Sequence, residues 1–298
     1  MTLTRLQPVS GWLVTGAGGQ LGSDVEDLLR AYNEECVAVG RADLDVTDRD
    51  DVDRVLADTR PDIVVNCAAY TNVDAAESDE DGAYAVNAHA PAILAERCAS
   101  IGARLVHVST DYVFAGDATA PYDEKTRPAP RTAYGRSKAA GEQAVLTSHA
   151  DAFVVRTAWL YGAAGPNFVK TMARLAGERE TLDVVEDQLG TPTWTLHLAR
   201  GLVALAVSDQ QPGIWHCTNA GEASWYVFAR AIFAELGLDP ARVQPTTTDK
   251  FPRPAPRPAY SVLSGHKWRA AGLPVMPHWR DALHEAFETL TDELTAAV

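Results

Sequence analysis

The residues whose chemistry is easiest to define are Tyr134 and Lys138, four positions apart in the segment TAYGRSKAAGE. On a helix this spacing places the two side chains on one face. A free tyrosine has a pKa of about 10 and is a poor acid or base at neutral pH, but a nearby ammonium group stabilises the phenolate and lowers that pKa. Nine tyrosines and five lysines among 298 residues would produce this spacing about 0.15 times by chance, so the pair alone is weak evidence.

A third polar group precedes this pair, at the end of the apolar run RLVHVST. The run predicts a buried strand, and it ends in Ser109 and Thr110. In a parallel sheet the active groups lie at the carboxyl ends of the strands, where a hydroxyl could hold a substrate carbonyl. A strand that ends in Ser-Thr and is followed by Tyr-x-x-x-Lys therefore favours chemistry on a carbonyl group.

A glycine-rich loop opens the chain in the segment VTGAGGQLGSDV, with Gly16, Gly19 and Gly22 at three-residue spacing. The loop follows an apolar run and precedes a helical period, as in dinucleotide-binding folds. The first glycine permits a tight turn, the second lets a pyrophosphate approach the backbone, and the third lets helix and strand pack closely. Unpaired amides at the start of the helix bind phosphates. We therefore predict a dinucleotide site here.

The end of the second apolar run, CVAVG, indicates which dinucleotide binds. An NAD-binding protein usually has a carboxylate at this point, but here the run ends at Gly40 and Arg41. A guanidinium group pairs well with a 2′-phosphate, which favours NADP over NAD. The alternative is a solvated loop arginine. Asp45, slightly further on, is expected to face the adenine edge.

Short apolar runs alternate with helical periods through the first half of the chain, from WLVT to AFVVRTAWLYG. This alternation predicts an α/β fold, a Rossmann-type doubly wound parallel sheet. After Gly162 the rhythm loosens, which indicates a smaller C-terminal substrate-binding domain. We predict an NADP-binding domain over residues 11–160 and a substrate domain over residues 161–298, interleaved so that some later segments return to the first domain.

Three segments carry more specific expectations. AYAVNAHAPAILAERCASIG predicts a long helix that is interrupted near Pro91 and ends at Gly102. TTTDKFPRPAPRPAYS is too rich in proline for a helix and is expected to be an ordered loop, although such a stretch could also bind a proline-recognition module. The last helix is expected to begin at about His278.

Composition excludes several other classes of protein. The net charge of −14 argues against a nucleic-acid binder, which needs a basic face. The four cysteines form no CxxC pair and are expected to be reduced, buried thiols of a cytoplasmic protein. Cysteine and histidine form no cluster, so no metal site is expected. The first ten residues do not resemble a signal peptide, and no apolar run is long enough to span a membrane.

Together these motifs resemble the extended short-chain dehydrogenase/reductase family. The blocks STDYVF and DQLGTPT, with PDIVVNCAAYTNVDAAE and RPAYSVL, resemble one branch of it, the dTDP-4-dehydrorhamnose reductases, from about Trp12 to Leu263. The resemblance implies NADPH-dependent reduction, with NADH possible, of dTDP-4-dehydro-L-rhamnose to dTDP-L-rhamnose for cell-surface polysaccharide. It implies a monomer or homodimer acting on a small nucleotide sugar.

The resemblance also implies roles for individual residues. The catalytic set would be Thr110, Tyr134 and Lys138. The cofactor would be bound by Tyr134, Lys138 and a larger group comprising Gly16, Gly19, Gln20, Leu21, Gly22, Arg41, Asp45, Val46, Ala68 and Ala69. The substrate would be bound by Thr110, Asp111, Trp159, Gln188 and Arg257. Some family members dimerise through a magnesium ion held by carboxylates. Asp24 stands next to the motif here, the sequence does not identify other ligands, and no metal dependence is expected.

Some of these residues also have purely structural interpretations. Trp159 could be core packing, Arg257 a solvated loop charge, and Thr110 a hydroxyl that satisfies the backbone. Two other functions stay open. One is a reductase of another nucleotide-linked 4-keto-6-deoxy sugar. The other is a non-catalytic NADP-binding subunit similar to the regulatory subunit of methionine adenosyltransferase, against which the retained Thr110, Tyr134 and Lys138 argue.

Overall fold

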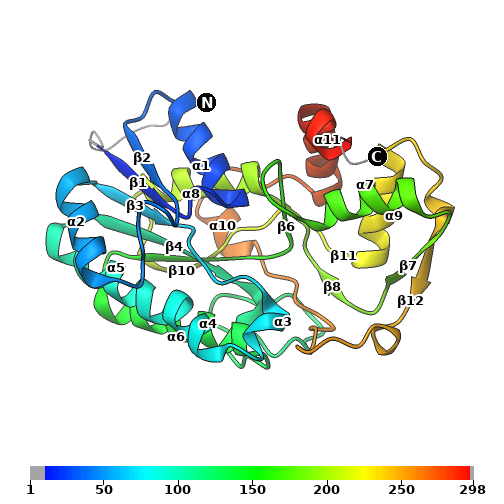
Figure 1. The fold of residues 1–298 in the computed structure, drawn as a ribbon, viewed down its shortest axis with the longest axis horizontal. Coiled ribbons are helices and arrows are strands. Elements are labelled where there is room, and N and C mark those ends of the chain that lie inside the picture. The colour runs from blue at the N-terminus through cyan, green and yellow to red at the C-terminus, as the bar shows by residue number, and fades with distance from the viewer. Residues whose placement is uncertain (1–10, 296–298) are drawn as a thin grey trace.

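The computed structural model describes residues 11–295; the segment in which no signal peptide was expected lies outside this range. Six parallel strands form the central sheet in the order β10-β5-β4-β3-β1-β2 (Figure 1). These strands are β1 (Trp12–Thr15), β2 (Cys36–Val39), β3 (Ile63–Asn66), β4 (Arg104–Thr110), β5 (Phe153–Thr157) and β10 (Gly213–His216). The strand order reverses between β1 and β3, and the carboxyl ends at such a point form a ligand crevice.

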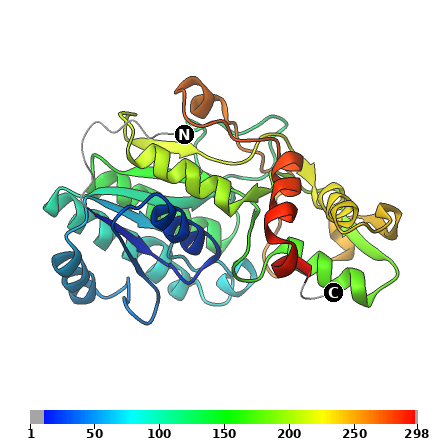
Figure 2. The same cartoon turned by 90° about the horizontal axis from the view of Figure 1, so that it is seen from above.

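Helices cover both faces of this sheet, which confirms the predicted Rossmann-type doubly wound fold. One face carries α1 (Gln20–Ala31) and α8 (Thr195–Ala206), which lie side by side in Figure 2. The other face carries α2 (Arg49–Thr59), α5 (Ala90–Ile101) and α6 (Ala133–Ser148). Because both faces are covered, the inner strands β1, β3 and β5 are fully buried, whereas the edge strands β2 and β10 are partly exposed.

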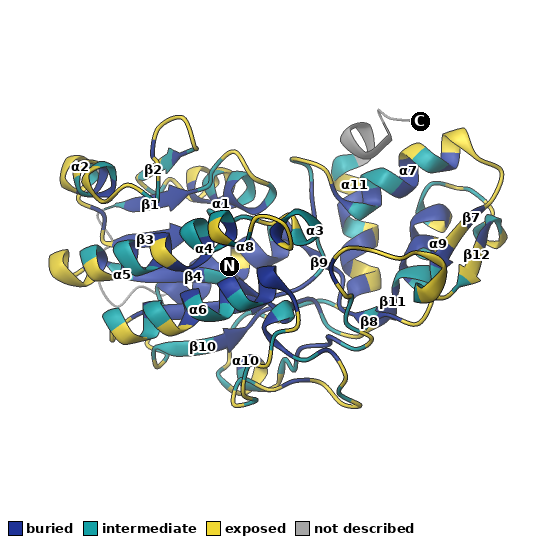
Figure 3. Cartoon of the chain, turned by 60° about the horizontal axis from the view of Figure 1, so that its bottom comes forward, coloured by how far each residue is buried: buried dark blue, intermediate teal, exposed yellow. Residues whose placement is uncertain are grey.

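A smaller lobe lies beyond the carboxyl ends of the strands and has its own apolar core, centred on Phe228, Phe233 and Trp279 (Figure 3). Its helices are α7 (Phe168–Glu178), α9 (Trp225–Glu235) and α11 (Trp279–Thr295). Its short strands pair as β6 (Leu160–Tyr161) with β9 (Thr193–Trp194), β7 (Leu182–Val185) with β12 (Val243–Thr246), and β8 (Leu189–Gly190) with β11 (Ala223–Ser224).

The chain passes between the two lobes more than once. After β9 it returns to the first sheet as α8 and β10, and α10 (His266–Ala270) packs against β10. Leu198, Leu202 and Leu205 of α8 are fully buried against that sheet. The proline-rich segment lies between β12 and α10. Apart from one short 3₁₀ turn it is a loop that bridges to β8 and to residue 117 through Tyr260.

Two predicted elements are divided in the structure. The long helix forms α4 (Glu80–Tyr84), a π-helical turn over Ala85–His89, and α5. The irregular turn immediately precedes Pro91, which has no N–H group to continue the helical hydrogen bonds. Gly102 ends α5 with φ +75°, as expected. The run AFVVRTAWLYG divides into β5 and β6 because Trp159 adopts φ +49°.

All four cysteines are free; Cys98 and Cys217 are buried, whereas Cys36 and Cys67 are half-buried. Among the described residues, none of the helices combines the length and apolar character needed to cross a bilayer.

Candidate active site

Thr110, Tyr134 and Lys138 converge at the carboxyl end of β4. Thr110 is the last residue of that strand, and Tyr134 lies in the first turn of α6, where the Thr132 hydroxyl caps the helix by accepting the Gly135 N–H at 2.9 Å. The Tyr134 phenol hydrogen-bonds the Thr110 hydroxyl. The structure therefore brings together the predicted set, and all three side chains are buried.

Ser109 and Thr110 have different roles because successive strand residues point to opposite faces. The Ser109 hydroxyl donates to Glu142 Oε1 at 2.6 Å, on the side of the sheet that α6 covers. Glu142 also accepts two hydrogen bonds from the fully buried guanidinium of Arg156, at 2.8 and 2.6 Å. Ser109 therefore belongs to a buried ion-pair network, and Thr110 is the hydroxyl at the Tyr134 phenol.

The pKa of Tyr134 lies above its ordinary value in this structure, in contrast to the sequence expectation. Burial raises it to about 12, the nearby charge of Asp111 adds to this, and the hydrogen bond with Thr110 opposes both. Lys138 instead donates to the backbone oxygen of Val108 at 2.7 Å. Tyr134 therefore holds its proton and is an acid rather than a base at neutral pH.

The pKa of Lys138 is also shifted in the structure. Burial lowers the pKa of its ammonium to about 8, although the charge of Glu142 opposes this change. Only 2% of the residue is exposed, so this cation is among the most deeply buried charges of the protein. A lysine with this pKa changes its protonation state close to physiological pH.

Asp111, a predicted substrate contact, lies directly beside the pair. Its Oδ1 accepts the Thr110 hydroxyl at 2.9 Å, and Thr110 in turn accepts the Tyr112 N–H at 3.2 Å. Burial raises the pKa of Asp111 to about 6, against opposing hydrogen bonds from Ser261 and Thr110. Thr110 thus satisfies the backbone, as one interpretation expected, and also contacts the phenol.

The glycine-rich loop has the geometry that a bound pyrophosphate requires. Gly16 adopts φ +71°, and a Cβ added there would lie 2.7 Å from the Ala68 nitrogen. A Cβ on Gly22 would lie 2.2 Å from the Gly16 oxygen. Gly19 begins α1, and within the described residues no side chain caps that helix. Its first amides are therefore available to a phosphate group.

Replacing Gly16 with alanine should damage this loop. The added Cβ would meet the backbone after β3 and would strain the left-handed conformation, so we expect a loss of about 2 kcal/mol or more in the free energy of unfolding. Binding of NADPH should weaken at least about ten-fold because the turn must move. Gly18→Ala is the matched control, since a Cβ there has no atom within 4 Å. Denaturant titration and NADPH fluorescence measure both effects, and equal behaviour of the two variants would contradict the expectation.

The other predicted cofactor residues line the same edge of the sheet. Ala68 and Ala69 lie in the turn that follows β3, and the backbone of Ala68 approaches Gly16 closely. Arg41 is exposed just beyond β2, and its charge helps to lower the pKa of Asp45, whose carboxylate mainly accepts hydrogen bonds from Thr47. The remaining members have these positions: Gln20 binds the Pro166 oxygen at 3.1 Å, Leu21 is buried in the core, and Val46 packs under α2.

Trp159 lies where the two lobes meet. Its ring stacks on that of Trp225, with centroids 3.5 Å apart and an interplanar angle of 5°. Gly190 makes room for it, because a Cβ at that position would lie 2.4 Å from the Trp159 ring. Both indoles are half-buried, so Trp159 is part of the packing and also presents a surface. Sequence reasoning missed Trp225, which is the first residue of α9.

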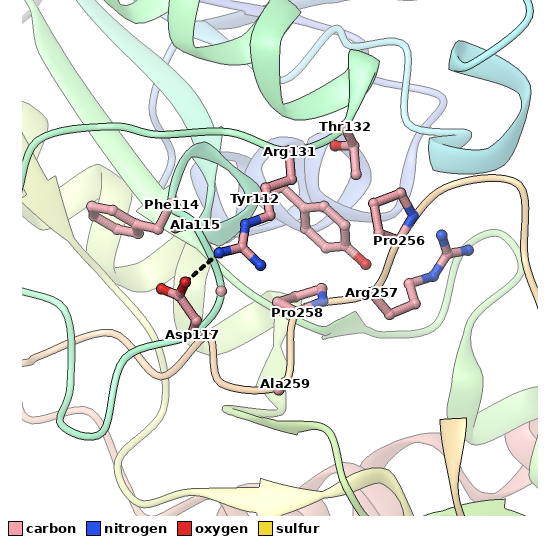
Figure 4. Close-up of a pocket in the computed structure, with 11 residues that line it drawn as sticks. Tyr112, Phe114, Ala115, Asp117, Arg131, Thr132, Pro256, Arg257, Pro258 and Ala259 are labelled. Carbon is pink, nitrogen blue, oxygen red and sulfur yellow. Dashed lines mark hydrogen bonds and ion pairs between the residues drawn. The ribbon is translucent and has the colours of Figure 1, made fainter. Parts of the chain in front are cut away.

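A cavity of about 140 Å³ adjoins Tyr134 through Tyr112, whose ring contacts that of Tyr134 edge-on at 5.6 Å. Figure 4 shows Arg257 reaching past Pro256 beside the Tyr112 ring. The described residues that line the cavity are Tyr112, Phe114, Ala115, Gly116, Asp117, Arg131, Thr132, Pro256, Arg257, Pro258 and Ala259. Its charged groups thus come from the segment before α6 and from the proline-rich loop.

Arg257 lines the cavity, whereas Gln188 does not. The Arg257 guanidinium pairs with Asp74 Oδ2 at 2.7 Å, and Asp74 Oδ1 accepts the Ala255 N–H at 3.2 Å. Asp74 lies on the short helix α3 (Val73–Ala76), so this pair ties the proline-rich loop to the first lobe. Gln188 is outside the cavity lining, and its amide donates to Thr248 at 2.9 Å.

No metal centre can be built from the described part of the chain, where no three Asp, Glu, His or Cys side chains cluster. Asp24 hydrogen-bonds Thr195, and burial raises its pKa.

The chain matches the RmlD substrate binding domain over residues 11–292. It is 50% identical to a dTDP-4-dehydrorhamnose reductase of Streptomyces griseus, over 95% of each chain. It is 52% identical to a probable dTDP-4,6-dihydroxy-2-methyloxan-3-one 4-ketoreductase of Streptomyces antibioticus, over 93% of this chain and 94% of the relative. Among solved structures, a Bacillus anthracis dTDP-4-dehydrorhamnose reductase in complex with NADP shares 41% identity with a TM-score of 0.91, over 94% of this chain and 99% of that one. The chain therefore belongs to the RmlD substrate binding domain family.

Proposed function

We propose that this protein reduces the 4-keto group of dTDP-4-dehydro-L-rhamnose to give dTDP-L-rhamnose, with NADPH as the preferred reductant and NADH as a possible one. The observation that carries the proposal is the hydrogen bond between Tyr134 and Thr110, buried at the end of β4 beside a loop shaped for pyrophosphate. The names of relatives at about half identity support it. We place the activity in the cytoplasm, in a monomer or homodimer.

The residues present fit a bound dinucleotide. Gly16 and Gly22 keep the loop tight, because a side chain at either position would collide with the backbone, and the uncapped start of α1 favours an anion. Arg41 would pair with the 2′-phosphate, and Asp45 with Val46 would flank the adenine. Ala68 and Ala69 would lie along the cofactor. When bound, NADPH supplies the hydride that reduces the carbonyl carbon.

Tyr134 supplies the proton. As the carbonyl is reduced, negative charge develops on its oxygen, and a phenol already held by Thr110 can donate to that oxygen without first reorganising. The high pKa of the buried phenol keeps the proton in place until an alkoxide, which is more basic, forms next to it. Lys138, one turn further along α6, then faces the phenolate that remains and stabilises it.

The substrate would lie between the lobes, with residues 11–160 forming the cofactor domain and residues 161–298 the substrate domain, apart from the segments α8, β10 and α10. Trp159, where the two lobes meet, would contact the nucleotide sugar, and Asp111 would contact it from the larger lobe. Arg257 is suited to bind a diphosphate because its planar group makes paired, charge-assisted hydrogen bonds. The Gln188 amide donates a hydrogen bond to Thr248, so this residue would contact the substrate only after its side chain rotates.

A second candidate substrate has direct support. A relative from Streptomyces niveus, 50% identical over 94% of this chain, is a dTDP-4-keto-6-deoxy-D-glucose reductase. A different 4-keto-6-deoxy sugar would use the same Tyr134, Lys138 and Thr110 and would differ only in its contacts with the smaller lobe.

The two candidates are separated by measuring the loss of reduced-nicotinamide absorbance. dTDP-4-dehydro-L-rhamnose and dTDP-4-keto-6-deoxy-D-glucose are supplied in parallel, each with NADPH and with NADH. We expect the highest kcat/KM with the first sugar and NADPH, and the cofactor ratio tests Arg41. Faster turnover of the second sugar would overturn the preferred substrate. Binding of NADPH without turnover of either sugar would favour a non-catalytic role.

A further inference from the structure

Three polar side chains for which the sequence predicts no role in the site lie in a row beneath the active site. Thr15, Asn66 and His107 are direct register partners on the adjacent strands β1, β3 and β4. The Thr15 hydroxyl lies 2.7 Å from Asn66 Oδ1, Asn66 Nδ2 lies 3.0 Å from His107 Nδ1, and His107 Nε2 lies 3.4 Å from Lys138 Nζ. All are buried, so this row is a continuous polar path to the lysine of the candidate active site.

The hydrogen-bond directions in this row follow from one backbone group. The Ala68 N–H can only donate, and it lies 3.1 Å from Asn66 Oδ1. That contact identifies the oxygen of the amide, so the NH₂ group of Asn66 faces His107. An NH₂ group can only donate, and His107 Nδ1 must therefore accept with its lone pair. A neutral imidazole in this position carries its hydrogen on Nε2.

His107 is neutral, because burial holds its pKa well below the usual value and the charge of Lys138 acts in the same direction. Its Nε2–H is therefore directed at Lys138. An ammonium group has three donors and no acceptor, so a protonated Lys138 meets another donor at this contact. A neutral amine has a lone pair that can accept. The contact consequently favours loss of the lysine proton.

The other groups that face Lys138 also favour one protonation state of its side chain over the other. The backbone oxygen of Val108 accepts a hydrogen bond from Nζ, and the charge of Glu142 on α6 favours the ammonium form. Cys67 after β3 is a neutral thiol, because burial raises its pKa to about 12. Tyr134 shares its helix face. Burial opposes the charge of Glu142 and dominates. His107 therefore acts in the same direction as burial and lowers the pKa of Lys138. Its effect can be reversed by changing its tautomer.

We propose that Asn66 and His107 are positioning residues that hold an N–H group against Lys138 and thereby set the upper pH limit of the reaction. The expected effect on the pH dependence of activity rests on the proposed function, in which the charged form of Lys138 stabilises the developing phenolate. Activity then falls as pH rises and the ammonium loses its proton.

Asn66→Asp is the decisive variant, because it keeps the size of the side chain and reverses the polarity. One carboxylate oxygen still accepts from Ala68 and Thr15, while the other accepts a hydrogen from His107 Nδ1. The Nε2 lone pair then receives a hydrogen bond from the Lys138 ammonium. We expect the alkaline limb of the kcat–pH profile to move upward by about one pH unit or more, a ten-fold change in proton affinity.

Two further variants separate the tautomer from the added charge. His107→Phe removes the N–H group without adding charge, and its alkaline limb should also move upward. His149→Phe is the matched control, since this buried histidine binds the Ala103 oxygen at 2.8 Å, at the opposite end of β4 from Thr110; its limb should stay unchanged. An unmoved or lower limb in both Asn66→Asp and His107→Phe would overturn the proposal.

The tautomer can be read without any substrate. Nitrogen NMR of the labelled protein should show the hydrogen of His107 on Nε2 in the natural protein and on Nδ1 in Asn66→Asp. A hydrogen on Nδ1 in the natural protein would overturn the proposal even if the reductase is fully active. If neither sugar is reduced, the proposed function fails, while this spectrum still decides the hydrogen-bond network.

Discussion

Replacing Tyr134 with phenylalanine should lower kcat by about 10²- to 10⁴-fold, the range that a positioned general acid contributes. The ring would still pack against Tyr112, but the oxygen that binds Thr110 would be lost. The alkoxide would then have no buried donor in place when it forms. NADPH titration should show a much smaller change in Kd, because the glycine loop is unchanged and only the Tyr134 contact with the cofactor is lost.

Tyr32→Phe is a suitable control for this experiment. Tyr32 is exposed at the end of α1, on a surface away from the carboxyl ends of the strands, and its removal should leave kcat unchanged. A Tyr134→Phe protein that keeps half or more of the natural kcat would rule out the phenol as the acid. The Thr110 hydroxyl would then be the group to replace next.

Replacing Glu142 with glutamine should lower the free energy of unfolding by about 3–5 kcal/mol, the usual cost of leaving a buried charge uncompensated. The Arg156 guanidinium is fully buried, makes two hydrogen bonds to Glu142, and lies over the Phe114 ring at 4.8 Å. A glutamine accepts with one oxygen only and carries no charge. Ser109 would lose its acceptor or compete for that oxygen.

The exposed pair between Arg136 and Glu80 is the matched control. Its nitrogen and oxygen lie 2.9 Å apart, similar to the buried pair, but both side chains are about 40% exposed. Glu80→Gln should therefore cost less than about 1 kcal/mol. Urea denaturation followed by circular dichroism measures both variants. Equal losses would show that burial is not what makes the Arg156 pair strong.

The parts of the site that the sequence predicts are those formed by local patterns. Gly16 and Gly22 follow a strand and open a helix, and Tyr134 and Lys138 are one turn apart, so neighbours in the chain define their geometry. The contacts that sequence reasoning missed join distant segments. Trp159 meets Trp225, Arg257 meets Asp74, and Asn66 meets His107 only after the sheet and the two lobes assemble.

The elements of the fold that the sequence does not predict also lack a local pattern. The six strands of the main sheet are apolar runs, and five of them lie in the region where strands and helices alternate. The paired strands β6 with β9 and β8 with β11 are only two residues long, too short to show a period of their own. The reversal at Trp159, with φ +49°, also has no local signal because a tryptophan rarely adopts this conformation.

The return of α8 and β10 to the first sheet has a consequence for how the protein is made. During synthesis β5 has no outer neighbour until residues 213–216 leave the ribosome, and the apolar side of α1 has no cover until α8 follows. The nascent cofactor lobe therefore presents an open sheet edge and a bare helix face while most of the smaller lobe is still being added. Ribosome-bound chains that end before residue 213 should accordingly be substrates for chaperones, whereas the released chain should not.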